Sequence, residues 1–185
     1  MSAVSVIIPT YNRARKLLRA ISSVLYQTFT DCEVIVVDDG SDDGTADCLK
    51  PVMGHIKHIR HPDTMGVSAA RNRGIRASRY PFVAFLDSDD YWLPTKLSTQ
   101  MAFFKRNSVA VACQTEEIWI RKGLRVNPGK RHLKPSGEIF VPSLKLCLVS
   151  PSSVLLKRSL LDEVGLFDED LPACEDYDLW LRICC

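Results

Sequence analysis

The chain has 185 residues, which is enough for one domain with a sizeable core. Its 46% hydrophobic and 25% charged residues are typical of a soluble globular protein, and no apolar run reaches the roughly 20 residues that a membrane-spanning helix needs. With 24 basic and 22 acidic residues the formal net charge is +2, so the composition predicts neither a transmembrane segment nor a nucleic-acid partner.

Apolar runs alternate with helical patterns in the first half of the chain. Residues 4–8 indicate a strand buried on both faces and closed by Pro9, and a helix over residues 12–27 follows, with Asn12 as its cap. The alternation continues with strands at 34–37, 56–60 and 82–86 and helices at 45–49, 67–78 and 94–106. This pattern predicts an α/β fold with a Rossmann-like, mainly parallel sheet flanked by helices.

The second half is less regular and predicts a mixed arrangement. Residues 109–120 indicate one long strand, residues 121–134 are basic and rich in turn residues, and residues 152–156 indicate a further strand. A helix begins near Cys174 and is anchored by Leu179, Trp180 and Ile183. Because no linker or repeat divides the chain, we expect a single domain over residues 1–185.

The seven cysteines are an odd number without a CxxC pair, so they indicate neither a zinc site nor a disulfide framework. The chain enters an apolar strand at once, without the basic region and long apolar stretch of a signal peptide. We therefore expect a cytoplasmic protein. Cys184 and Cys185 end the chain inside a helical pattern, which indicates a truncated domain.

Polar residues follow three of the predicted strands: Thr10 the first, Asp38-Asp39 the second and Asp87-Ser88-Asp89-Asp90 the fourth. The carboxyl ends of parallel strands share one edge of the sheet, where open α/β folds bind ligands. Converging carboxylates repel one another unless a cation or hydrogen-bond donors offset their charge, so the cluster predicts a metal. Asp87 and Asp89 lie on the same side of an extended segment, which suits Mg²⁺ or Mn²⁺ shared with a diphosphate.

Each motif also has a purely structural interpretation. An Asp-x-Asp match alone indicates a solvated turn more often than a metal site, and Asp38-Asp39 either caps a loop or accepts hydrogen bonds from a base or ribose. In the helical segment 66–74, Arg71 either meets phosphate or is exposed beside close helix packing. Asp176, in the first turn of the last helix, either serves the helix dipole or takes a proton from an acceptor hydroxyl.

The chain resembles family 2 glycosyltransferases of the GT-A fold over nearly its whole length. The resemblance rests on five motifs that occur in order and at sensible spacing: Pro9-Thr10-Tyr11-Asn12-Arg13, Val37-Asp38-Asp39-Gly40-Ser41, Gly66 through Gly74, Asp87-Ser88-Asp89-Asp90 and Glu175-Asp176. It implies a nucleotide-diphosphate-sugar donor, a UDP-sugar first of all, and Mn²⁺ or Mg²⁺ as cofactor. It further implies transfer with inversion to a saccharide or lipid-linked acceptor, in the cytoplasm or peripherally at the inner face of the membrane.

By matching positions, the resemblance implies a role for each site residue. The residues expected to bind the donor are Pro9, Thr10, Tyr11, Asp38, Asp39, Arg71, Asp87 and Ser88. Among them Asp39 would contact the base, Arg71 the diphosphate, and Asp87 the sugar and ribose. Asp89 would ligate the metal and Asp176 would be the general base. Residues 1–106 would then form the nucleotide-binding half and residues 107–185 the acceptor-side half.

The chain departs from the family pattern at its end and leaves other functions open. It lacks the Gln-x-x-Arg-Trp motif of processive members, which indicates a non-processive enzyme or a missing region. A nucleotidyltransferase would need a glycine-rich, basic loop where Pro9 through Asn12 stand, and a signalling receiver would need its acidic pair at the first strand. A module that binds nucleotide-sugars without turnover remains as a non-enzymatic alternative.

Overall fold

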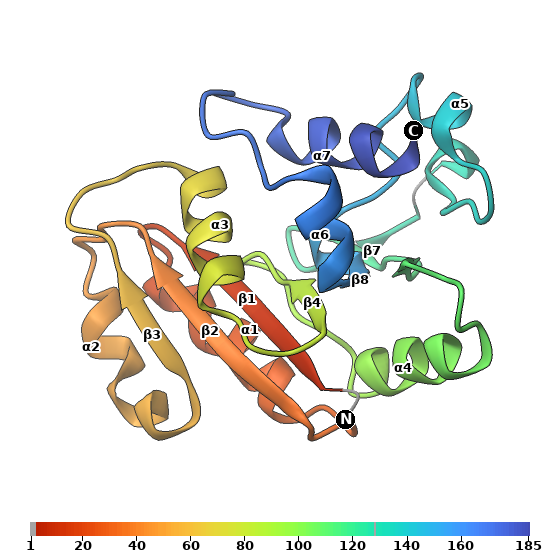
Figure 1. Ribbon diagram of the computed structural model, residues 1–185. Coiled ribbons are helices and arrows are strands. Elements are labelled where there is room, and N and C mark those ends of the chain that lie inside the picture. Colours follow the sequence, from red (N-terminus) through yellow and green to blue (C-terminus); the bar gives the residue numbers. More distant parts are fainter. Residues whose placement is uncertain (1–2, 128) are drawn as a thin grey trace.

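The computed structural model describes residues 3–127 and 129–185. Within them a six-stranded sheet, in the order β3-β2-β1-β4-β8-β5, forms the centre of the molecule (Figure 1). The parallel strands are β1 (Val4–Thr10), β2 (Cys32–Asp38), β3 (Lys57–Arg60) and β4 (Phe82–Phe85). β8 (Val154–Lys157) runs antiparallel to both β4 and β5 (Ala112–Gln114). The predicted α/β fold with a mainly parallel sheet is confirmed.

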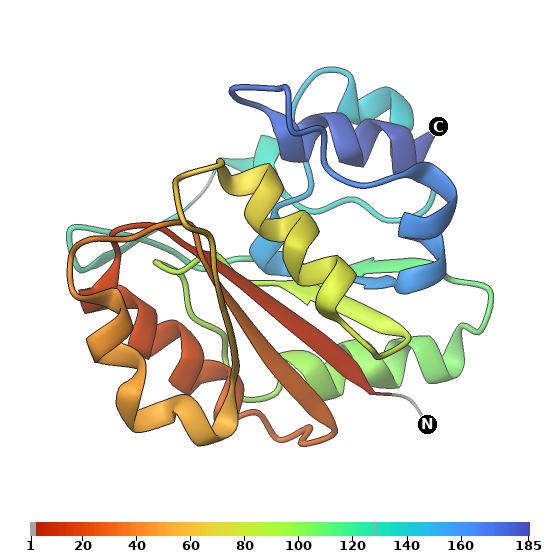
Figure 2. The same ribbon diagram turned by 60° about the vertical axis from the view of Figure 1, so that its left-hand side comes forward.

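Helices cover both faces of the sheet (Figure 2). α1 (Ala14–Leu25), α2 (Thr45–Leu49) and α4 (Lys96–Arg106) pack on one face, and a 3₁₀ turn η1 (Lys50–His55) extends α2. The other face is covered by α3 (Val67–Ala77), α6 (Arg158–Val164) and α7 (Glu175–Cys184). Every residue of β1 is buried, which explains its unbroken apolar run, because a central parallel strand has no solvated face.

One close contact sets the position of α3 on the sheet. A Cβ atom added to Gly74 would lie 2.4 Å from Cγ2 of Ile7, a residue of β1 that is fully buried. Only glycine therefore allows the helix backbone to approach β1 this closely. Arg71 lies one turn earlier on the same helix, so this contact also determines where its guanidinium can reach.

The prediction that Asn12 caps the first helix is wrong. Asn12 adopts a left-handed conformation (φ 50°), and α1 begins two residues later, at Ala14. The amide of Ala14 donates instead to the carboxylate of Asp43, at 3.0 Å, while the Asn12 side chain accepts the amide of Asp42 at 2.9 Å. The loop after β2 thus supplies the cap, a long-range contact that local sequence does not reveal.

The single long strand predicted over residues 109–120 is also wrong. The chain leaves the main sheet after β5 and forms a separate two-stranded ribbon of β6 (Trp119–Arg121) and β7 (Leu124–Val126). Lys122 and Gly123 both have positive φ, which is the geometry of a two-residue hairpin turn. The short elements η2 (Lys130–His132), α5 (Phe140–Ser143) and η3 (Pro151–Ser153) follow, so the predicted irregularity of the second half is confirmed.

None of the helices in residues 3–127 and 129–185 is both long and apolar enough to cross a bilayer.

Candidate active site

Three strands bring their polar ends to one edge of the sheet. Thr10 and Asp38 are paired across β1 and β2, and the amide of Asp39 donates to the carbonyl of Thr10 at 2.9 Å. Asp87 follows β4, the other neighbour of β1. The predicted residues Pro9, Thr10, Asp38, Asp39, Asp87, Ser88 and Asp89 therefore lie along this carboxyl edge, as expected for an open parallel sheet.

Arg71 forms the centre of a charged cluster at this edge. Its Nη2 donates to Oδ1 of Asp87 at 2.9 Å, and its Nη1 donates to Oε1 of Glu175 at 2.6 Å. The side chain is only 5% exposed, and the guanidinium carbon lies 5.2 Å from the ring centroid of Phe167. The alternative in which Arg71 is merely exposed is wrong, because three elements meet around this group: α3, the loop after β4 and α7.

The two carboxylates determine the charge state of Arg71. Burial lowers the pKa of the guanidinium, but the neighbouring Asp87 and Glu175 outweigh burial and leave the pKa raised. Sequence reasoning did not identify Glu175 as the partner of Arg71, since 104 residues separate them. No local signal connects the two positions, because the contact depends on how α7 packs on α3.

Asp176 lies beside this cluster in the first turn of α7. Its pKa is raised, first by burial and then by the carboxylates of Glu175 and Asp87, against the lowering effect of the Tyr177 amide and Arg71. Its Oδ1 accepts that amide at 2.8 Å. A half-buried carboxyl with a raised pKa is suited to accept a proton near neutral pH.

The loop after β4 is held by Ser152 of η3. The Ser152 hydroxyl accepts the amide of Asp87 at 3.1 Å and donates to Oδ2 of Asp90 at 2.7 Å, while its carbonyl accepts the indole N–H of Trp92 at 2.8 Å. Ser152 thus contacts both ends of the acidic sequence, a role that nothing in its local sequence indicates. Partial burial raises the pKa of Asp90, and Asp87 and Asp89 raise it further.

The side chain of Asp89 is 43% exposed and makes no contact with Arg71. Its closest cation is the Nζ of Lys16, at 3.5 Å, and its backbone carbonyl accepts a hydrogen bond from Arg19 at 3.2 Å. The carboxylate of Asp89 is therefore accessible from solvent at the same edge as the buried Arg71 cluster.

Asp39 organises the loop that leads into α3. Its Oδ1 accepts the amide of Met65 at 3.0 Å and lies 2.7 Å from Nδ1 of His61, and its Oδ2 accepts the amide of Gly66 at 2.8 Å. Gly40 packs on the same loop, since an added Cβ would lie 2.9 Å from the Asp63 carbonyl carbon. The structure therefore gives Asp39 a structural task at the place where a nucleobase contact is predicted.

Asp38, Thr10 and Tyr11 occupy different environments. Asp38 is fully buried, and its Oδ1 accepts the amide of Ser41 at 2.9 Å. Among the described residues, its Oδ2 and the Oγ1 of the buried Thr10 have no hydrogen-bond partner. Tyr11 is 48% exposed, so its ring is available to a ligand at the edge.

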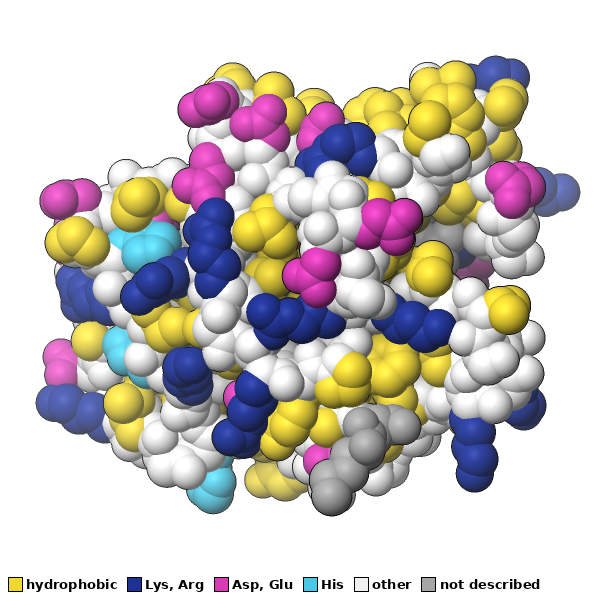
Figure 3. Space-filling model, viewed as in Figure 1, with side chains coloured by type: hydrophobic (Ala, Val, Ile, Leu, Met, Phe, Trp, Pro, Cys, Tyr) yellow, Lys and Arg dark blue, Asp and Glu magenta, His cyan; other side chains and the backbone are white. Residues whose placement is uncertain are grey.

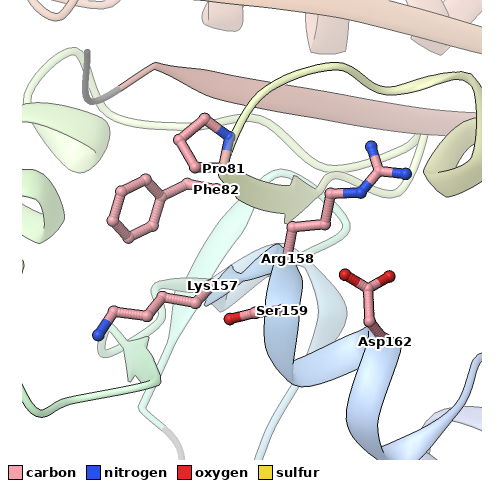
Figure 4. Close-up of a pocket in the computed structure, with 6 residues that line it drawn as sticks. All are labelled: Pro81, Phe82, Lys157, Arg158, Ser159 and Asp162. Atoms are coloured by element: carbon pink, nitrogen blue, oxygen red, sulfur yellow. The ribbon is translucent and has the colours of Figure 1, made fainter.

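A hollow of about 200 Å³ connects the Asp39 loop with the Arg71 cluster. It is lined by residues 65–68 at the start of α3, by residues 169–172 and by Glu175. The Ser68 hydroxyl, in this lining, is buried and has no partner among the described residues. A larger hollow of about 340 Å³, lined by Pro81, Phe82, Lys157, Arg158, Ser159 and Asp162, lies at the opposite edge of the sheet and contains none of the predicted residues (Figure 4).

The donor set at the carboxyl edge fits a cation that is shared with a ligand. Among the residues that the structure describes, no three His, Cys, Asp or Glu side chains are grouped closely enough to hold a metal ion alone. Mg²⁺ and related hard cations commonly bind through one or two carboxylates together with substrate phosphate oxygens. The exposed carboxylate of Asp89, next to the Arg71-bound Asp87, is compatible with that arrangement.

Comparisons of sequence place the chain among known proteins. The family model described as Glycosyl transferase family 2 matches residues 5–165. The chain is 35% identical to an uncharacterized glycosyltransferase of Rickettsia conorii over 184 residues, 97% of this chain and 30% of that protein. It is 34% identical over 181 residues to the UDP-Glc:alpha-D-GlcNAc-diphosphoundecaprenol beta-1,3-glucosyltransferase WfgD of Escherichia coli, covering 97% of this chain and 69% of that protein.

Solved structures share the fold. S. aureus TarS 1-349 has a TM-score of 0.81 and 26% identity, covering 98% of this chain and 55% of that one. Its complex with UDP has a TM-score of 0.80 and 25% identity, covering 96% and 53%. The mannosyltransferase PcManGT from Pyrobaculum calidifontis, in complex with GDP-Man and Mn²⁺, has a TM-score of 0.73 at 20% identity, covering 97% and 51%. The chain thus spans about half of these structures.

Proposed function

Because the chain belongs to glycosyl transferase family 2 and has the GT-A fold, we propose that it transfers a sugar from a nucleotide-diphosphate donor to an acceptor hydroxyl, with inversion. The observation that carries the proposal is the meeting of Asp87, Glu175 and Asp176 around Arg71 at the carboxyl edge of the sheet. The loop after β4, α3 and α7 supply these side chains; Glu175 lines the 200 Å³ hollow, and the next residue, Asp176, is a carboxyl with a raised pKa. A purely structural ion pair would not need Asp176.

In the proposed reaction Asp176 is the general base. The acceptor oxygen attacks the anomeric carbon while its proton passes to the Asp176 carboxylate, and the bond from that carbon to the phosphate oxygen breaks. The electron pair of that bond leaves with the nucleoside diphosphate. Direct displacement from the opposite side inverts the anomeric centre.

The donor would lie along the edge formed by Thr10, Tyr11 and the Asp39 loop. Tyr11 is the exposed aromatic side chain there, and a planar base can pack on such a ring. The carboxylate of Asp39 already makes three contacts with the loop before α3. We propose that its remaining lone pair accepts a hydrogen bond from the base, and that Asp39 also holds residues 65 and 66 in place. Asp38 is fully buried, and by accepting the amide of Ser41 it would hold the turn after β2 in place.

Arg71 would act mainly by holding Asp87 and Glu175 together. Nη1 and Nη2 each donate one hydrogen bond to these carboxylates, and the Nε–H has no hydrogen-bond partner among the described residues, so we propose that a donor remains for the diphosphate. Asp89 would hold a divalent cation together with the diphosphate, and Asp87 and Ser88 would face the ribose and sugar. When bound, the cation would offset the negative charge that develops on the leaving diphosphate.

Relatives indicate the class of donor and acceptor. TarS has been solved with UDP, and the E. coli relative WfgD is described as using UDP-Glc and an acceptor linked to diphosphoundecaprenol. We therefore propose a UDP-hexose as donor and a sugar on a polyprenyl diphosphate as acceptor.

Calorimetry of UDP binding with and without Mn²⁺ tests the donor site. We expect Asp89→Ala to abolish the Mn²⁺-dependent part of UDP binding, because the cation loses the carboxylate that we propose as its ligand. Lys16→Ala, which removes only the 3.5 Å ion pair of Asp89, is the matched control and should keep that dependence. Equal UDP binding by Asp89→Ala and the parent protein would refute the metal assignment.

A further inference from the structure

The positive charge of the protein is concentrated in one hairpin. We define the basic hairpin as residues 118–127 and 129–134, which include β6, β7 and η2. It contains six basic residues and no acidic ones, so the rest of the chain, with 18 basic and 22 acidic residues, has a formal charge of −4. The six are Arg121, Lys122, Arg125, Lys130, Arg131 and Lys134.

Five of these six cations are free to meet an external anion. Lys134 pairs with Glu117 at 3.2 Å and is largely buried. The other five are exposed, and in the described part of the chain none of them forms an ion pair. On the face shown in Figure 3, over α3, α6 and α7, basic and acidic side chains are intermixed instead. That face therefore lacks the single sign of charge that the basic hairpin carries.

Apolar side chains are exposed among these cations. The most exposed is Leu124, at 73%, and the others are Leu133, Ile120, Ile118 and Trp119. Ile120 stands opposite Arg125 and Arg121 opposite Leu124, so each face of the ribbon presents an apolar side chain beside a cation. Among the described residues the ribbon pairs with no strand of the main sheet, and five of its six strand residues are exposed. The ring of Trp119 lies 4.9 Å from that of His132, within the basic hairpin.

We propose that the basic hairpin docks the protein on an anionic phospholipid bilayer. Cations attract the phosphate groups of the leaflet, and exposed Leu, Ile and Trp side chains enter the boundary between headgroups and acyl chains. Tryptophan in particular is favoured at that boundary, because its ring is apolar and its N–H is polar. A nucleic acid would use the cations but would leave Leu124 and Ile120 in water, so the exposed apolar side chains favour the membrane.

The basic hairpin lies next to the acceptor side of the site. Glu117, at its base, contributes to the raised pKa of Asp90 in the acidic loop. Figure 2 shows the hairpin projecting from the end of the molecule at which β1 passes into α1. Docking would therefore bring the carboxyl edge close to the bilayer. This inference rests on the proposed function for its purpose, because a polyprenyl-linked acceptor is held in the membrane.

Sedimentation of the full chain with vesicles tests the proposal. We expect at least about tenfold tighter binding to vesicles containing phosphatidylglycerol than to phosphatidylcholine vesicles, and loss of that preference at high salt. Arg121→Glu with Arg125→Glu should weaken binding at least tenfold. The matched control is Lys105→Glu with Arg106→Glu, the same charge change at the exposed end of α4, and should bind as the parent does.

Intrinsic fluorescence gives a second readout. Trp92 and Trp180 are 7% and 2% exposed whereas Trp119 is 38% exposed, so a blue shift on adding phosphatidylglycerol vesicles should vanish in Trp119→Phe. Equal binding to both vesicle types, an equal loss in the α4 control, or displacement of vesicles by an RNA oligonucleotide would overturn the proposal. UDP calorimetry on the same variants separates the two proposals. Vesicle binding without UDP binding would refute only the proposed glycosyltransferase function, and UDP binding without vesicle binding would refute only the proposed membrane docking.

Discussion

The carboxylates after β2 and those after β4 are the same residue type at the same edge of one sheet, yet they do different work. Asp39 accepts hydrogen bonds from the amides of Met65 and Gly66 and lies against His61, so most of its hydrogen-bonding capacity holds a loop. After β4, Asp87 shares Arg71 with Glu175, and the carboxyl of Asp176 beside them has a raised pKa. The carboxylate of Asp39 therefore stabilises a loop, whereas Asp176, beside Arg71, is the carboxylate that we propose as the proton acceptor.

The largest expected effect is a loss of sugar transfer on substitution of Asp176. Asp176→Asn keeps the shape of the side chain but cannot accept a proton, so sugar transfer should fall about 10²- to 10⁴-fold, the usual contribution of a general base. UDP affinity should change less than twofold. Asp178→Asn, in the same helical turn, is the control and should keep activity, because Asp178 pairs with Arg182 instead. Full transfer by Asp176→Asn would remove the base assignment.

The next effect tests whether Asp39 is structural. Asp39→Asn replaces one acceptor oxygen by an N–H₂ group that meets amide donors, so we expect a loss of about 2–3 kcal/mol in the free energy of unfolding. Urea denaturation measures the loss, and hydrogen exchange should show the Met65 and Gly66 amides less protected. Asp42→Asn, whose side chain makes no hydrogen bond among the described residues, is the control. Unchanged stability would make Asp39 a ligand-binding residue only.

The pH profile of transfer sharpens the contrast. Asp176 must be deprotonated to act, so the rate should rise with pH through its raised pKa and level off above it. Glu175→Gln removes one charge that raises this pKa and leaves Arg71, which lowers it, free to act more strongly. The rising limb should therefore move to lower pH. A limb that stays in place would exclude electrostatic control of Asp176 by this cluster.

The smallest effect concerns stability at Asp90. Its raised pKa means that the folded protein binds the proton more tightly than the unfolded chain, so the stabilising contribution present at low pH is lost as pH rises through that pKa. Asp90→Asn cannot ionise, so at neutral pH its free energy of unfolding should exceed that of the parent protein. Because Asp90 is exposed to solvent, we expect the gain to be only about a few tenths of a kcal/mol. Thermal unfolding at neutral and acid pH measures the difference. A stability gain of equal size at neutral and at acid pH would show that ionisation of Asp90 is not its cause.

The sheet and its polar edge were predictable because they follow from local patterns. Unbroken apolar runs predict central strands, and acids directly after a strand predict residues at its carboxyl edge. The buried Asp38 and the exposed Asp89 both fit that pattern equally well, so the sequence could not separate them. Their difference comes from the loops that cover each one.

The contacts that sequence reasoning missed all join distant segments. Asp43 caps α1 from 29 residues away, Ser152 holds Asp87 from 65 residues away, and Glu175 reaches Arg71 across 104 residues. The wrong strand prediction over residues 109–120 has a different origin. The apolar residues of this segment show no clear strand periodicity, and the turn at Lys122 and Gly123 determines that β6 pairs with β7. The roles proposed for individual site residues stay predictions.

The close approach of Gly74 to Ile7 couples the hydrophobic core to the charged cluster. A bulkier residue at either position would lift α3 off β1 and carry Arg71, one turn away, out of reach of Asp87. A substitution deep in this core would therefore disturb the proposed active site even where the fold survives, and a larger residue at one position should be tolerated only with a smaller residue at the other.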